Sequence, residues 1–114
     1  MKAGDLILVR FPFTDLDHSK KRPALVLKVI PYSPKLKLIQ IAIITSQIDL
    51  PEIEGDYLIQ DWKEASLLHP SRLRLAKIAT IESELVEKNL GALSKKDRTK
   101  ISKLFSSHFK EWSL

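Results

Sequence analysis

The fold is decided at Lys20-Lys21-Arg22-Pro23-Ala24-Leu25-Val26-Leu27, where three consecutive cations and a proline lead into an apolar run. Proline lacks an N–H and restricts the residue before it, so Arg22 is biased towards an extended conformation where a loop becomes a strand. A guanidinium held at the mouth of a rigid strand is well placed to bind a phosphate through two hydrogen bonds. The junction therefore predicts both the start of a core strand and an anion-binding position.

The residues after this junction predict a β-hairpin, with strands at Ala24–Ile30 and Leu36–Thr45 joined by a turn at Pro31-Tyr32-Ser33-Pro34. A turn centred between Ser33 and Pro34 pairs residues whose numbers sum to about 67, which places Arg22 opposite Thr45. Directly opposed residues lie about 4.5–5.5 Å apart at Cβ, so the guanidinium and the hydroxyl can share one phosphate. A register slip of one residue would turn Thr45 to the other face and leave it as a strand-end residue near a solvated arginine. Both arrangements stay open.

The rest of the chain predicts a small fold with one helix. Further strands are expected at Asp5–Phe11, Tyr57–Gln60 and Ser71–Ile81, with irregular loops over residues 14–21 and 47–56 and a helical turn capped by Asp61. Ser94-Lys95-Lys96-Asp97 resembles a capping box with Asp in place of Glu or Gln. An apolar stripe at helical spacing follows: Ile101, Leu104, Phe105, His108, Phe109 and Trp112. We expect this stripe to pack on the sheet, with a dimer contact as the alternative.

These elements predict a fold class that is mainly β (α+β), a small β-barrel of about six or seven short strands with a C-terminal amphipathic helix. A length of 114 residues predicts a single domain over residues 1–114. The absence of cysteine excludes disulfides and thiolate metal sites. No apolar run approaches the roughly 20 residues of a membrane helix and no signal peptide is recognisable, so we expect a cytoplasmic protein without membrane association. The net charge of +5 fits a polyanionic partner or an ordinary basic surface.

Three blocks of the sequence resemble PemK/MazF-type toxins, in the same order along the chain. The first block contains Gly4–Val9, Phe11–Asp15 and Lys21–Leu27, the second is Ala42–Gln47, and the third lies between Asp61 and Ile81. The resemblance implies an SH3-like barrel that works as a homodimer. It also implies the toxin of a type II toxin–antitoxin system, a metal-independent endoribonuclease that cleaves single-stranded mRNA at selected sequences. Its expected inhibitor is a cognate antitoxin with an acidic, disordered tail.

The resemblance also implies roles for individual residues. Arg22 and Thr45 match the family's catalytic arginine and threonine, and Arg74 matches an arginine linked to RNA binding or cleavage. The other expected RNA contacts are Lys20, Lys21, Ser46 and Gln47. One departure is Ala76, because many relatives carry at this position an Asp to which proton transfer is assigned. His18 is then the candidate proton carrier, with a solvated loop histidine as the alternative.

The expected cleavage needs few protein groups, because RNA carries its own nucleophile in the 2′-OH. Arg22 can stabilise charge on the phosphorus oxygens, but an arginine pKa above about 12 makes it a poor general base. Thr45 can orient the phosphate through a hydrogen bond. His69 and His108 show no ligand-like spacing, so we expect no metal and no other cofactor. Two other functions stay open: a barrel toxin that poisons a protein such as DNA gyrase, and a catalytically inactive RNA-binding barrel.

Overall fold

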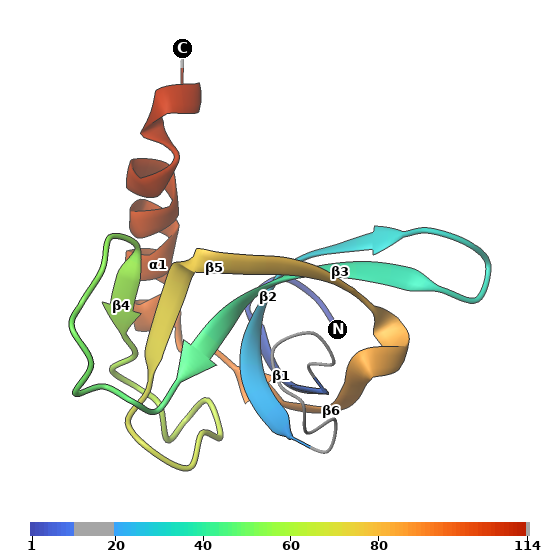
Figure 1. Cartoon of the computed structure of the whole chain (residues 1–114), viewed down its shortest axis with the longest axis horizontal. Coiled ribbons are helices and arrows are strands. Elements are labelled where there is room, and N and C mark those ends of the chain that lie inside the picture. Colours follow the sequence, from blue (N-terminus) through green and yellow to red (C-terminus); the bar gives the residue numbers. More distant parts are fainter. Residues whose placement is uncertain (11–19, 114) are drawn as a thin grey trace.

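Six antiparallel strands form one curled sheet, and a single α-helix stands beside it in the computed structural model, which describes residues 1–10 and 20–113 (Figure 1). The strands are β1 (Asp5–Arg10), β2 (Lys21–Pro31), β3 (Lys37–Thr45), β4 (Asp56–Leu58), β5 (Arg72–Glu82) and β6 (Val86–Ala92). The helical segments are η1 (Ser83–Leu85), α1 (Lys95–His108) and η2 (Lys110–Trp112). The strand order β4-β5-β3-β2-β1-β6 leaves β4 and β6 as edges, so the sheet is barrel-like without closing. The predicted mainly β fold with a C-terminal helix is confirmed.

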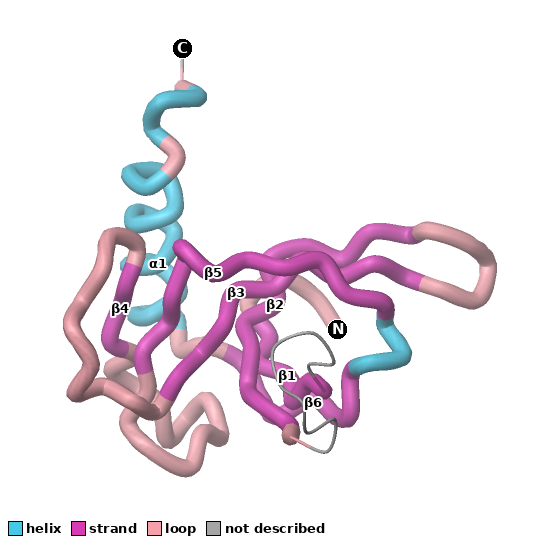
Figure 2. The backbone as a smooth tube through the Cα atoms, viewed as in Figure 1, coloured by secondary structure: helices cyan, strands magenta, loops and turns pink. Residues whose placement is uncertain are grey.

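The hairpin of β2 and β3 has the predicted register near its base. The Cα partners Ala24–Ile43, Leu25–Ala42 and Val26–Ile41 have residue numbers that sum to 67. A bulge beyond Val26 shifts the pairing by one residue, and the hairpin tip projects away from the side on which α1 stands (Figure 2). Bulges increase local twist, and others interrupt the pairings of β1 with β6 and of β3 with β5. The sheet therefore bends enough to bury side chains on both of its faces.

Two hydrophobic cores result, because successive side chains of a strand point to opposite faces. In β2, Leu25 belongs to one core, whereas Ala24 and Val26 belong to the other. The first core also includes Ile101 of α1 and Leu67 of the connection between β4 and β5. A strand that is buried on both faces has no need of polar alternation, which explains the uninterrupted apolar run in β2.

Three local expectations differ from the structure. Strand β6 was not predicted, because two register shifts in its pairing with β1 disrupt the alternation of its side chains. The segment after Asp61 forms turns over residues 61–66, and the Asp61 carboxylate accepts a hydrogen bond from Ser94 at 2.6 Å. The apolar stripe packs only in part, since Ile101 is buried but Trp112 is 85% exposed.

The carboxylate of Asp97 ties the start of α1 to the segment that follows β4. Asp97 is fully buried and accepts hydrogen bonds from the Tyr57 hydroxyl at 2.5 Å, the Gln60 N–H at 3.0 Å and the Asp61 N–H at 2.8 Å. The Ser94 hydroxyl accepts from the Asp97 N–H at 3.2 Å, so the cap at Ser94 is confirmed. Asp97 thus serves as an anchor between helix and sheet, which differs from the usual capping box.

These contacts also determine the charge states of Asp97 and Tyr57. Burial acts to raise the pKa of Asp97, but the hydrogen bond from Tyr57 and the backbone hydrogen bonds outweigh it and hold the pKa below its ordinary value of 3.8. Burial and the contact with Asp97 raise the pKa of the Tyr57 hydroxyl, so this group stays a donor at neutral pH.

Two arginines of β5 hold the loop over residues 47–56. Arg72 donates to the carbonyl oxygens of Leu50 and Ile48 at 2.8 and 3.0 Å. Arg74 donates to a carboxylate oxygen of Asp56 at 3.3 Å, and Arg72 lies 3.8 Å from the same oxygen. The Asp56 side chain is fully buried between them. The contacts of both guanidinium groups therefore stabilise the loop and the edge strand β4.

Replacing Asp97 should weaken the fold in a pH-dependent manner. Asp97→Ala leaves one hydroxyl and two N–H groups without their acceptor, so we expect the free energy of unfolding to fall by at least about 3 kcal/mol near pH 7. Because the folded-state pKa is lowered, the carboxylate stabilises the fold above its unfolded pKa, and this contribution disappears as pH falls through the folded pKa. Urea unfolding near pH 7 and near pH 3 measures this, and Asp97→Asn should show a smaller loss between the two conditions than the wild type. An equal loss in both proteins would contradict the assignment.

Replacing Arg74 should destabilise the protein more than replacing an exposed cation of the same strand. Arg74→Ala removes the nearer partner of the buried Asp56, and we expect the free energy of unfolding to fall by about 3 kcal/mol. This value is at the low end for a broken buried ion pair, because Arg72 remains near Asp56. The matched control is Lys77→Ala, which should change stability by no more than about 0.5 kcal/mol. Equal unfolding midpoints for the two variants would show that the contacts of Arg74 contribute little.

Candidate functional site

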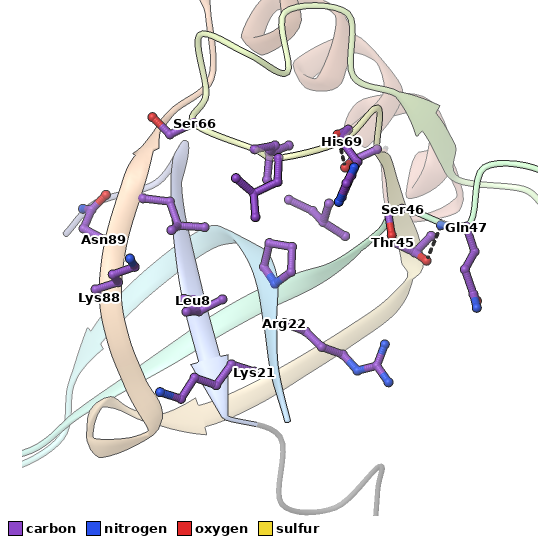
Figure 3. Close-up of a pocket in the computed structure, with 16 residues that line it drawn as sticks. Leu8, Lys21, Arg22, Thr45, Ser46, Gln47, Ser66, His69, Lys88 and Asn89 are labelled. Carbon is purple, nitrogen blue, oxygen red and sulfur yellow. Dashed lines mark hydrogen bonds between the residues drawn. The ribbon is translucent and has the colours of Figure 1, made fainter. Parts of the chain in front are cut away.

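A pocket of about 560 Å³ opens where the start of β2, the end of β3, strand β6 and the segment over residues 66–71 meet (Figure 3). Its apolar part includes Leu8 of β1, Pro23 of β2 and Ile44 of β3. Leu8 and Pro23 are Cα partners, so Pro23, which has no N–H, occupies the position where the β1–β2 ladder reaches the pocket. The rest of the lining is mainly polar and basic, which makes this pocket the candidate functional site.

Arg22 and Thr45 line this pocket together. The β2–β3 ladder ends at Ala24–Ile43, so the expected pair of Arg22 and Thr45 is not among its Cα partners: Arg22 pairs with Val9 and Thr45 with Arg72. The Arg22 side chain still runs towards the side of the pocket where Thr45 lies (Figure 3). The Thr45 hydroxyl oxygen accepts a hydrogen bond from the Gln47 N–H at 3.1 Å. The hydroxyl can still donate its hydrogen to an oxygen atom of a bound molecule.

Among the described residues, the positive charge of the pocket comes from Lys21, Arg22 and Lys88. The Lys21 Nζ lies 3.5 Å from one carboxylate oxygen of Glu87, and the other carboxylate oxygen of Glu87 bonds Arg10. The hydrogen bond from Arg10 lowers the pKa of Glu87. No Asp or Glu belongs to the pocket lining within the described part of the chain. A pocket with cations, hydroxyls and no carboxylate favours an anionic ligand such as a phosphodiester.

One wall of the pocket is the segment that carries Ser66 and His69 (Figure 3). The segment is held on both sides of His69, because Leu67 and Ser71 are buried and the Ser71 hydroxyl donates to the His69 carbonyl oxygen at 2.8 Å. It approaches β6 so closely that a Cβ on Gly91 would lie 2.9 Å from the Ala65 carbonyl oxygen. Glycine is therefore required at Gly91 if the wall is to lie this close to β6.

The predicted site residues divide into three groups. Lys21, Arg22, Thr45, Ser46 and Gln47 all line the pocket. Lys20 is exposed just before β2 and Arg74 is tied to Asp56, and neither belongs to the lining. His18 lies outside the described residues. Ala76 is exposed where β5 bulges away from β3, also outside the lining.

Sequence reasoning missed His69, Lys88 and Asn89, which the structure adds to the lining. His69 was considered only as a metal ligand, and its neighbours in sequence gave no sign of a shared pocket. Lys88 and Asn89 lie on β6, which has no regular alternation of side chains in its sequence because its pairing with β1 is irregular. The Asn89 side chain donates to the Asp5 carboxylate at 3.3 Å, which fixes its position next to β1.

The described residues contain neither a cluster suited to a metal ion nor a helix suited to span a membrane. Over residues 1–10 and 20–113, no group of three or more His, Cys, Asp and Glu side chains is arranged to hold a metal ion. Within the same ranges, no helix combines the length and the apolar character that a membrane span requires.

Comparison with known proteins assigns the chain to a family. A solved endoribonuclease from mycobacterial species, in complex with its cognate antitoxin, superposes with a TM-score of 0.66 at 12% sequence identity, covering 96% of this chain and 95% of that chain. At so low an identity, the superposition shows a shared fold and nothing more. No curated protein matches the chain. The family model for PemK-like, MazF-like toxins of type II toxin–antitoxin systems matches residues 2–109. The chain therefore belongs to the family of PemK-like, MazF-like toxins of type II toxin–antitoxin systems.

Proposed function

We propose that this toxin is an endoribonuclease that cleaves single-stranded mRNA in the cytoplasm at selected sequences, without a metal ion. The observation that carries the proposal is the pocket in which Arg22 and Thr45 lie together among further cations. Family membership and the endoribonuclease fold neighbour support it. Single-stranded RNA is a suitable substrate because its unstacked bases can be bound on their edges and faces.

In the proposed mechanism, the scissile phosphate binds between Arg22 and Thr45. The guanidinium donates to the non-bridging oxygens and stabilises the charge that grows on them as the 2′-oxygen attacks phosphorus. The Thr45 hydroxyl donates to the phosphate and fixes its orientation, while its oxygen stays bonded to the Gln47 N–H. The bond to the 5′-oxygen then breaks, which leaves a cyclic phosphate and a 5′-hydroxyl. Ser46, Gln47 and Lys21 are the proposed contacts to neighbouring nucleotides.

Arg22→Ala and Thr45→Ala should each lower the cleavage rate by about 10²-fold or more, because each removes a preorganised contact to the reacting phosphate. The measurement is single-turnover cleavage of a long single-stranded RNA in excess chelator, with the products separated by size. The matched control is Lys35→Ala, an exposed cation at the tip of the β2–β3 hairpin. Its rate should equal that of the wild type.

The same assay separates the proposed function from its alternatives. Intact RNA with the wild type would exclude an endoribonuclease. RNA that binds but is not cut would indicate an inactive RNA-binding barrel. Growth arrest in cells with intact RNA would indicate a toxin that acts on a protein.

We further propose that the toxin works as a homodimer and is inhibited by an antitoxin with an acidic, disordered tail. The lining with Lys21, Arg22 and Lys88 and without a described carboxylate suits an acidic peptide as well as it suits RNA. An extended acidic tail would then compete directly with the substrate.

Lys88→Gln should weaken the binding of single-stranded RNA and of polyglutamate to this pocket. Removing one cation that contacts phosphate should reduce the slope of log affinity against log salt by about 0.7 for RNA. Fluorescence anisotropy at several salt concentrations measures both ligands, with Lys35→Gln as the control that should retain the wild-type slope. Polyglutamate that fails to displace RNA would argue against an acidic tail in the pocket.

A further inference from the structure

The cleavage reaction needs an acceptor for the proton of the 2′-OH, and few side chains of the pocket qualify. The lysines and the arginine are protonated at neutral pH and cannot accept a proton. The hydroxyl and amide side chains of the lining, Thr45, Ser46, Gln47, Ser66, Ser71 and Asn89, are too weakly basic. An imidazole ordinarily titrates near pH 6.5, so its neutral form is abundant at physiological pH. Among the described residues, the lining contains one imidazole, that of His69.

The position of His69 suits this task. The ring points from its wall into the pocket, on the same side of the site as Thr45 and Ser46 (Figure 3). The backbone that carries it is fixed by the buried Leu67 and Ser71 and by the hydrogen bond to the His69 carbonyl oxygen. A base on a fixed backbone beside a phosphate-binding strand end can face the nucleophile of a bound dinucleotide.

We propose that His69 is the general base of the reaction, an inference that rests on the proposed endoribonuclease function. A ring nitrogen of the neutral imidazole takes the proton of the 2′-OH as the 2′-oxygen forms its bond to phosphorus. The bond between phosphorus and the 5′-oxygen breaks, and the 5′-oxygen takes a proton from water. The imidazolium then returns its proton to solvent, so the products are the 2′,3′-cyclic phosphate and the 5′-hydroxyl.

The charged side chains that share the pocket with His69 are all cations within the described lining. They are Lys21 and Arg22 from β2 and Lys88 from β6, whereas the end of β3 contributes only uncharged side chains. The phosphate of the bound RNA adds negative charge between His69 and Arg22. A rate-versus-pH profile at saturating RNA therefore reports on the proton acceptor within the RNA complex.

The test measures single-turnover cleavage from about pH 5 to about pH 9 with wild type, His69→Ala and His69→Lys. We expect the wild-type rate to fall as the solution becomes acidic and His69→Ala to be slower by about 10²-fold, with little change in RNA affinity. His69→Ala should also lose the acidic limb of the profile and regain rate when free imidazole is added. His69→Lys keeps a cation but no base, so it should be as slow as His69→Ala. Thermal unfolding should be unchanged, because the His69 side chain is exposed.

The outcomes separate this inference from the proposed function. A wild-type protein that leaves RNA intact would overturn the endoribonuclease proposal and the base with it. A wild type that cleaves, with His69→Ala equally fast and with the same pH profile, would overturn only the role of His69. A His69→Lys variant that retains the wild-type rate would also overturn it, because the group would then act as a cation.

Discussion

The buried carboxylate of Asp97 connects the helix, the edge of the sheet and the wall of the pocket. A carboxylate excluded from water is stable only when several donors compensate for the lost hydration. Tyr57 and the N–H groups of Gln60 and Asp61 provide them, and their positions fix the backbone that leads from β4 towards His69. The same residue stabilises the first turn of α1 through its N–H. The geometry of the pocket therefore depends on an ionised group that lies outside it.

The placement of carboxylates in the rest of the described chain explains why the pocket is basic. Asp56 is neutralised by Arg72 and Arg74, and Glu87 is bonded to Arg10 and Lys21. The Asp5 carboxylate accepts from the Lys2 N–H at 2.9 Å, within the turn that opens β1. None of these acids belongs to the described pocket lining, although Lys21 and Asn89 of the lining contact Glu87 and Asp5. Lys21, Arg22 and Lys88 therefore give the described lining a positive charge that suits an anionic ligand, although the net charge of the whole chain is only +5.

The sequence allowed the central hairpin to be predicted in more detail than the lining of the pocket. Proline before an apolar run and a turn between two long strands are local signals, so the hairpin and its register at Ala24–Ile43 could be predicted. Bulges depend on tertiary packing. The sequence therefore did not allow β6, or the presence of Lys88 in the pocket, to be predicted. The pocket wall depends on Gly91, where the contact with Ala65 joins residues that are far apart in the sequence. Arg74 shows the converse: its residue type fits RNA binding, but its guanidinium is engaged by Asp56.

The position of Ala76 changes how the proton transfer of this toxin should be viewed. The family resemblance implies a proton-transferring Asp at the position that Ala76 occupies in this chain. In this chain, however, Ala76 lies where β5 bulges away from β3, and it does not line the pocket that holds Arg22 and Thr45. In the proposed mechanism, Arg22 and Thr45 at the rigid strand ends bind the phosphate, and His69 on the pocket wall is the base.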